Sequence, residues 1–201
     1  GAADAETMRT ERGQLEKGLE ALLAREGYTT RRQPRHSFAG GKWSLRYLRA
    51  GGGEGNIEID INYLLRVPLW KPQKRESVTI ARLQARNVTV VDPHEVAAGK
   101  IVALLTRTAP RDLYDAWWIL HRMPLDPVRL RTALSIYAAT SPADLTETSG
   151  VLPETDEVEV ANLLIPVLRK GWQEGAATPM ERVRQLRREC MAKLQMVLPF
   201  T

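Results

Sequence analysis

The alternating segment IEIDIN at residues 57–62 constrains the fold more than any other feature of the chain. Because successive side chains of a β-strand point to opposite faces, the isoleucines would cover a core and the polar residues would line the other face. A second alternating segment, KWSLRYL at 42–48, lies just ahead of it, and a glycine-rich stretch at 50–55 separates the two. The sequence therefore predicts a β-hairpin with a flexible tip.

Helical periodicity accounts for most of the remaining chain. The predicted helices cover residues 8–25, 93–107, 110–121, 128–140, 157–171 and 179–196. The β-branched segments 77–83 and 87–91 predict further short strands. We expect a mixed α+β domain over residues 1–122, followed by a helical C-terminal region over residues 123–201.

Composition indicates an ordinary globular protein that acts in the cytoplasm. The 201 residues include 29 Lys and Arg against 24 Asp and Glu, which gives a net charge of +5. No stretch approaches the run of about twenty apolar residues that spans a bilayer, and the first residues lack the features of a secretory signal. The single cysteine cannot form an internal disulfide, which favours a reducing compartment. We expect no membrane partner.

Basic residues are concentrated between positions 25 and 49, where Glu26 is the only acid. The basic residues are Arg25, Arg31, Arg32, Arg35, Lys42, Arg46 and Arg49. Such a patch attracts the phosphates of a nucleotide or of a nucleic acid. A solvated face of the first helix and the hairpin is an equally good interpretation.

The acids of the predicted strand, Glu58 and Asp60, lie on one face and repel each other. One interpretation is that Lys42, Arg46 or Arg49 on the neighbouring strand neutralises them. The other is that they bind a divalent metal together with acids from elsewhere in the chain. The sequence leaves both interpretations open.

A second acidic pair, Asp4-Ala5-Glu6, stands at the start of the chain. On a strand, such a pair projects both carboxylates to the same side, where they can hold Mg²⁺ while substrate phosphates complete the coordination. Acidic pairs near chain ends are also common without any function. The metal interpretation therefore depends on a third carboxylate, such as Asp60, lying close to this pair.

Lys100 lies in the otherwise apolar segment 96–105, so its ammonium must reach solvent or meet an anion. In the next predicted helix, Asp112 falls in the first turn, where the helix dipole is a sufficient reason for an acid. Asp115 lies deeper, where aspartate is a poor helix former and needs a specific partner. A structural ion pair with Lys100 and a catalytic pair that engages a nucleotide phosphate are equally good interpretations.

Two stretches of the chain carry a family resemblance: IEIDINYLLRVPL at 57–69 and DPHEVAAGKIVALLTRTAPRDLYDAWWIL at 92–120. The second has a glutamate, a lysine, an apolar half-turn, an arginine and then Arg-Asp-x-Tyr-Asp. Together they resemble the AbiEii/AbiGii-type toxin family of nucleotidyltransferases, a branch of the DNA polymerase β-like superfamily. The resemblance covers roughly residues 57–120, and a weaker match at Asp4-x-Glu6 extends it to the N-terminus.

The resemblance implies a nucleotidyltransferase-like mixed sheet flanked by helices, and it assigns roles to individual residues. The family's paired acids bind Mg²⁺ or Mn²⁺ and fall on Asp4 and Glu6, and the superfamily's third carboxylate falls on Asp60. The family lysine, which binds phosphate, falls on Lys100, and the acid of the last motif falls on Asp115. The residues assigned to substrate binding are Lys100, Glu58, Asp112 and Arg66.

The implied reaction moves an NMP from an NTP to an acceptor, by analogy an RNA such as a tRNA end. The resemblance further implies that the chain is a toxin with a cognate antitoxin. Family members have a Gly-Gly or Gly-Ser turn before the paired acids, whereas only GAA precedes Asp4, and Glu6 replaces the usual second aspartate. We therefore expect that residues are missing before or just after Gly1, or that the site is degenerate. A non-catalytic binding module and a nucleotidyltransferase acting on a small molecule are the alternatives.

Overall fold

The computed structural model describes most of the chain and places it in the α+β class, as predicted. The described residues are 5–36, 40–63, 67–107, 109–141, 143, 145, 152, 156–168, 172, 175–176 and 178–198. Within them the chain forms helices and two small antiparallel sheets, which is consistent with a nucleotidyltransferase-like fold. The chain divides into two compact units, residues 1–67 and 68–201, which we describe separately.

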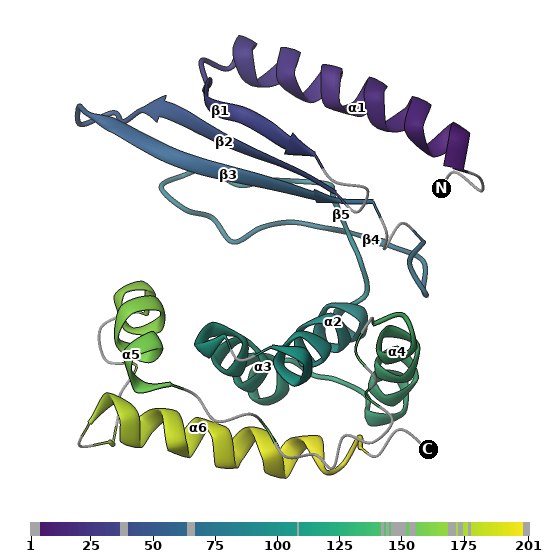
Figure 1. Ribbon diagram of the computed structural model, residues 1–201, viewed down its shortest axis with the longest axis vertical. Helices are drawn as coiled ribbons and strands as arrows, with labels where there is room; N and C mark the ends of the chain where they lie inside the picture. Colours follow the sequence, from purple (N-terminus) through teal and green to yellow (C-terminus); the bar gives the residue numbers. More distant parts are fainter. Residues whose placement is uncertain are drawn as a thin grey trace. The chain divides into compact units, whose positions relative to one another are not determined.

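Unit 1 is an antiparallel sheet of order β1-β2-β3 with one long helix along a face (Figure 1). Its elements are α1 (Ala5–Arg25), β1 (Thr29–His36), β2 (Gly40–Leu48) and β3 (Glu54–Asn62). The pairing of β2 with β3 confirms the predicted hairpin. Its tip turns through Gly52 and Gly53, whose positive φ angles glycine adopts at no steric cost.

The register of β2 and β3 determines which side chains of unit 1 are buried. Trp43 lies opposite Ile59 and Leu45 opposite Ile57, and the Trp43 and Leu45 side chains are buried. The helix α1 covers this face, and the indole N–H of Trp43 donates to the Glu20 carboxylate at 3.4 Å. The polar residues that alternate with these along β3 therefore point away from α1.

Unit 2 is mainly helical, and its long helices begin at prolines. They are α2 (Pro93–Thr106), α3 (Pro110–Arg122), α4 (Pro127–Ala139) and α6 (Pro179–Leu194). Proline suits the first helical position because its missing N–H would have no helical partner there. The side chains of Asp92, Asp126 and Thr178 cap α2, α4 and α6 by accepting a backbone N–H.

The helix predicted over residues 157–171 is shorter and less regular than expected. It consists of α5 (Glu157–Glu159), a π-helical turn (Val160–Leu164) and a 3₁₀ turn (Ile165–Val167). Pro166 has no N–H to donate to the preceding turn, which explains why the α-helix does not continue through it.

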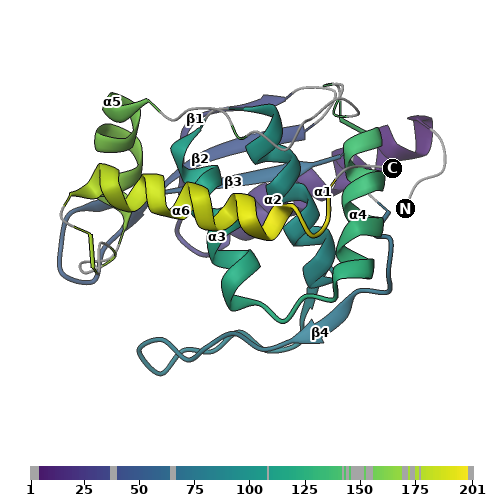
Figure 2. The same ribbon diagram turned by 90° about the horizontal axis from the view of Figure 1, so that it is seen from below.

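The core of unit 2 is continuous from α2 to α6. The helix α2 packs on α3 and α4, and α6 packs on α3, as Figure 2 shows from below. Fully buried residues such as Ile101, Leu134, Leu186 and Cys190 belong to this one cluster. The expected division between residues 122 and 123 therefore falls inside a shared core. No helix in the described part of the chain has the length and apolar character needed to cross a membrane.

A long hairpin precedes the helices of unit 2. Its strands β4 (Gln73–Arg75) and β5 (Val88–Val90) pair antiparallel, and Figure 2 shows the segment between them as an extended loop. The strand predicted over residues 77–83 is wrong, because the chain reverses inside it. Ala81 and Arg82 both have positive φ, and Ile80 pairs with Leu83 across the turn. This is the geometry of a tight type I′ turn.

Candidate functional site

The acids of β3 share a cation from β2. In the antiparallel register Lys42 lies opposite Asp60, and Ser44 lies opposite Glu58. The Lys42 ammonium is 2.9 Å from a Glu58 carboxylate oxygen and 3.8 Å from an Asp60 oxygen. Its hydrogen bond and charge hold the pKa of Glu58 below the ordinary value. The structure thus contains the cross-strand ion pairs that the sequence offered as one interpretation.

These acids are also open to solvent. The Glu58 and Asp60 side chains expose 58% and 70% of their surface. Ion pairs this exposed are weak, so a ligand or a second cation could compete with Lys42 at little cost. The position of the ammonium also establishes that the two carboxylates are close enough to share one cation.

The structure places Glu6 on a helix and not on a strand. Glu6 lies exposed in the first turn of α1, where an acid interacts favourably with the helix dipole. Residues 5–12 are mostly good helix formers, which explains why a helix replaces the expected strand. Asp4 and Arg66 lie outside the described residues. Among the residues that the structure does describe, no group of three or more His, Cys, Asp or Glu is placed to hold a metal.

In unit 2, Lys100 and Asp115 form a contact between α2 and α3. The Lys100 ammonium is 2.7 Å from the Asp115 carboxylate, and the two side chains expose 41% and 36% of their surface. The structure therefore contains the helix-to-helix ion pair that was one of two interpretations. Because both groups remain accessible, the contact does not prevent the ammonium from meeting an anion from solvent.

Asp112, unlike Asp115, is closed off from solvent. Its side chain is fully buried, and both of its oxygens accept hydrogen bonds from Arg107, at 2.5 and 2.9 Å. The same contact raises the pKa of Arg107. The guanidinium–carboxylate pair ties the C-terminal end of α2 to the first turn of α3. The structure thus gives Asp112, which was assigned to substrate binding, a structural contact that leaves no free oxygen.

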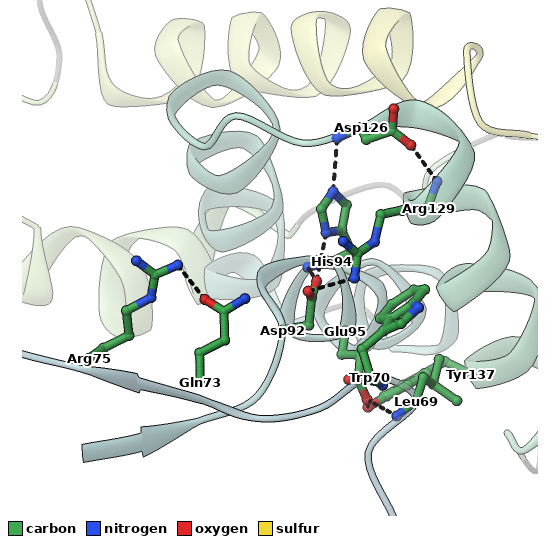
Figure 3. Close-up of polar contacts among 10 residues, drawn as sticks. All are labelled: Leu69, Trp70, Gln73, Arg75, Asp92, His94, Glu95, Asp126, Arg129 and Tyr137. Carbon is green, nitrogen blue, oxygen red and sulfur yellow. Dashed lines mark hydrogen bonds and ion pairs between the residues drawn. The ribbon is translucent and has the colours of Figure 1, made fainter. Parts of the chain in front are cut away.

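Glu95 is a buried acid that received no role from the sequence. Its carboxylate accepts the backbone N–H groups of Leu69 (2.9 Å) and Trp70 (3.2 Å) and the hydroxyl of Tyr137 (3.3 Å), as Figure 3 shows. Burial, followed by this contact, raises the pKa of Tyr137. Glu95 therefore fastens the segment after Pro68 to α2 and α4. Two features of the sequence could have indicated a role for Glu95: it is the glutamate that precedes the lysine in the family motif, and it stands in a mostly apolar helix.

A second buried network surrounds the start of α2. Asp92 caps the helix, and its carboxylate also contacts His94 Nδ1 (2.6 Å) and Arg129 (2.9 Å), as Figure 3 shows. Because His94 Nε2 accepts the backbone N–H of Asp126, the imidazole proton resides on Nδ1 and is donated to Asp92. Arg129 also stacks on Trp70, 4.4 Å from the ring centre. This network positions α2 and α4, and its polar atoms are occupied.

The basic segment 25–49 is partly neutralised within unit 1. Arg25 pairs with Glu26 (3.1 Å), Lys42 with Glu58 (2.9 Å) and Arg46 with Glu54 (3.4 Å). For these three residues the structure agrees with a solvated face of helix and hairpin, and phosphate binding by the rest of the segment stays a prediction.

In a comparison with known protein families, the chain matches a family model described as nucleotidyl transferase AbiEii toxin of a type IV toxin–antitoxin system. The match covers residues 4–194, which include α1, both sheets and all the residues discussed above. Searches of curated proteins and of solved structures gave no match.

Proposed function

The chain belongs to the AbiEii family of nucleotidyl transferase toxins, and we propose that it transfers an NMP from an NTP to an RNA acceptor in the cytoplasm. The family is part of a type IV toxin–antitoxin system, which implies an antitoxin partner. The identity of the acceptor and the assignment of individual residues belong to the proposal.

One observation carries the assignment of residues. Within the motif at 92–120, the acids Glu95 and Asp112 are buried and fully engaged in structural contacts. Lys100 and Asp115 are the charged pair of this motif that stays accessible. A lysine that projects from an otherwise apolar helix to the surface suits a role in binding the negative charge of a triphosphate. We therefore assign phosphate binding to Lys100 and the positioning of its ammonium to Asp115.

We assign cation binding to Asp60, with Glu58 as its neighbour on the same face of β3. The Lys42 ammonium, which Glu58 and Asp60 share, supports this assignment, because it occupies a position that attracts positive charge. Carboxylate oxygens are the ligands that Mg²⁺ and Mn²⁺ prefer. A bound cation would supply charge neutralisation at the NTP phosphates.

In the proposed reaction, an acceptor hydroxyl attacks the α-phosphorus of the NTP. A new phosphodiester bond forms and the bond between the α-phosphorus and the oxygen that bridges to the β-phosphate breaks. Pyrophosphate leaves, and the proton of the attacking hydroxyl passes to solvent. Charge accumulates on the phosphate oxygens as this occurs, so the Lys100 ammonium stabilises the transition state more than the ground state.

The test is transfer of label from α-³²P-labelled NTPs to bulk tRNA in Mg²⁺ or Mn²⁺, with Asp60→Ala and Lys100→Ala as the decisive variants. We expect transfer by the wild type and a loss of about 100-fold or more in each variant. Arg184→Ala is the control, because Arg184 on α6 also forms an exposed ion pair, with Glu157. Transfer in the absence of any RNA would indicate a small-molecule acceptor, and no transfer under any condition would indicate a non-catalytic binding module.

A further inference from the structure

The hairpin of β4 and β5, residues 73–90, carries an excess of positive charge. Its one acid is Glu76, and its basic residues are Lys74, Arg75, Arg82 and Arg86. All four basic side chains are exposed. None of them takes part in an ion pair among the residues that the structure describes.

Neutral oxygens orient three of these cations without cancelling their charge. The contacts run from Lys74 to the Thr89 hydroxyl (2.6 Å), from Arg75 to the Gln73 amide (2.5 Å, Figure 3) and from Arg86 to the Gln84 amide (3.3 Å). Glu76 accepts a hydrogen bond from the other side of the Gln84 amide, at 3.2 Å. The hairpin thus presents partly ordered cations that are available to an external anion.

The tip of the hairpin is apolar and held in shape by its own hydrogen bonds. Val78, Ile80 and Leu83 expose 77%, 69% and 77% of their surface. Two backbone hydrogen bonds between Ile80 and Leu83, at 2.9 and 2.8 Å, close the turn, and Ser77 N–H donates to the Ala85 carbonyl at 2.9 Å. Aliphatic side chains this exposed on an ordered turn mark a contact surface.

We propose that hairpin 73–90 is an RNA-binding arm, an inference that rests on the proposed function and names the surface by which its acceptor is held. The four cations contact backbone phosphates, and the aliphatic tip packs against unpaired bases. Charge complementarity selects a polyanion, because the cations have no carboxylate partner. An anionic membrane is the less suitable partner, since residues 73–90 contain no aromatic side chain to anchor the tip at an interface.

The test is the affinity of the full chain for fluorescein-labelled tRNA, measured by anisotropy at several salt concentrations without NTP or metal. The hairpin variant is Lys74→Gln/Arg75→Gln/Arg82→Gln/Arg86→Gln. The matched control, Arg9→Gln/Lys17→Gln/Arg122→Gln/Arg188→Gln, removes one lysine and three arginines that are exposed elsewhere. We expect at least a 10-fold loss of affinity in the hairpin variant and a fall of about 3 in the slope of log K against log salt. The control should lose less than about 3-fold.

A second variant, Ile80→Ser/Leu83→Ser, separates the tip from the charges. It should weaken tRNA binding about 3-fold or more while the salt slope stays unchanged, because no phosphate contact is lost. Equal losses in the hairpin and control variants would overturn the proposal, as would binding to vesicles of phosphatidylglycerol and phosphatidylcholine without binding to tRNA. A wild type that binds tRNA through the hairpin but transfers no NMP would contradict the proposed function alone.

Discussion

The Lys100 ammonium lies 2.7 Å from the Asp115 carboxylate and joins α2 to α3 through a contact that solvent can reach. Exposed pairs of this kind contribute about 1 kcal/mol or less to the free energy of unfolding. Arg107 and the fully buried Asp112 link the same two helices through two hydrogen bonds. Lys100 is therefore not required to hold the helices together, which leaves its ammonium for another use.

Exchanging the two charges tests whether NMP transfer needs only an ion pair between α2 and α3 or needs the ammonium on α2. Lys100→Asp/Asp115→Lys keeps opposite charges on the two helices, so we expect its stability to lie within about 1 kcal/mol of the wild type. NMP transfer should remain at least about 100-fold below the wild type, since the ammonium no longer projects from α2. Urea unfolding and label transfer give the two measurements. Recovery of transfer in the exchanged variant would contradict a phosphate-binding role.

Removing Arg107 should lower the stability of the protein, in contrast to the exchange of Lys100 and Asp115. Arg107→Ala leaves the Asp112 carboxylate buried without its partner, so we expect the free energy of unfolding to fall by about 2–4 kcal/mol. The matched control is Arg111→Ala, an exposed arginine in the first turn of α3, which should cost less than about 0.5 kcal/mol. Urea titrations followed by circular dichroism give both values. Equal free energies of unfolding for Arg107→Ala and Arg111→Ala would show that Arg107 does not stabilise the buried Asp112 carboxylate.

The sequence predicted well those elements whose formation depends on residues close together in the chain. The alternation in residues 57–62 was sufficient to predict β3, because a slip by one residue would place its isoleucines on the face of Lys42 and Ser44. The predicted starts of α2, α3, α4 and α6 fall at or beside the prolines with which these helices begin. The segment 77–83 was misjudged, because β-branched content says nothing about a type I′ turn formed by Ala81 and Arg82, residues that rarely take positive φ.

The sequence identified several residues of the candidate site, but it did not show which residues they contact. Lys100 in an apolar segment and Asp115 deep in a helix suggested a contact between the two, and the structure contains it. The sequence does not show that Asp112 turns inward to Arg107, because the packing of α2 on α3 decides this. Glu95 could not be assigned, because its partners include backbone N–H groups, which every residue except proline has. Glu6 lies on a helix because a two-residue acidic pattern does not outweigh the helix propensity of the residues that follow it.

The Asp92 network predicts how stability depends on pH. Burial opposes ionisation of Asp92, but the hydrogen bonds from His94 and the charge of Arg129 outweigh it, so its pKa in the folded protein lies below the ordinary value. Its contribution to stability is therefore complete above about pH 5 and is lost as the pH falls through the lowered pKa. Asp92→Asn should cost about 2–4 kcal/mol at pH 7 and progressively less below about pH 4.

Urea unfolding of the wild type and of Asp92→Asn at several pH values between neutral and acid gives this difference directly. Asp156→Asn is the control, because Asp156 caps α5 in an exposed position and should show a small difference at every pH. A cost of Asp92→Asn that stays constant into the acid range would mean that the carboxylate charge contributes nothing.

The thiol of Cys190 should be inert in the folded protein. It is fully buried in the core of unit 2, and burial raises its pKa to about 12. At pH 8 the thiolate fraction is then about a thousandfold lower than in the unfolded chain, so reaction with a disulfide reagent such as DTNB should require unfolding. The absorbance of the released thiol, followed with and without urea, measures both rates. Leu48→Cys in a Cys190→Ser background places a thiol at an exposed position of β2 and should react at once. A native Cys190 that reacts as fast as this control would mean that α6 does not stay packed on α3.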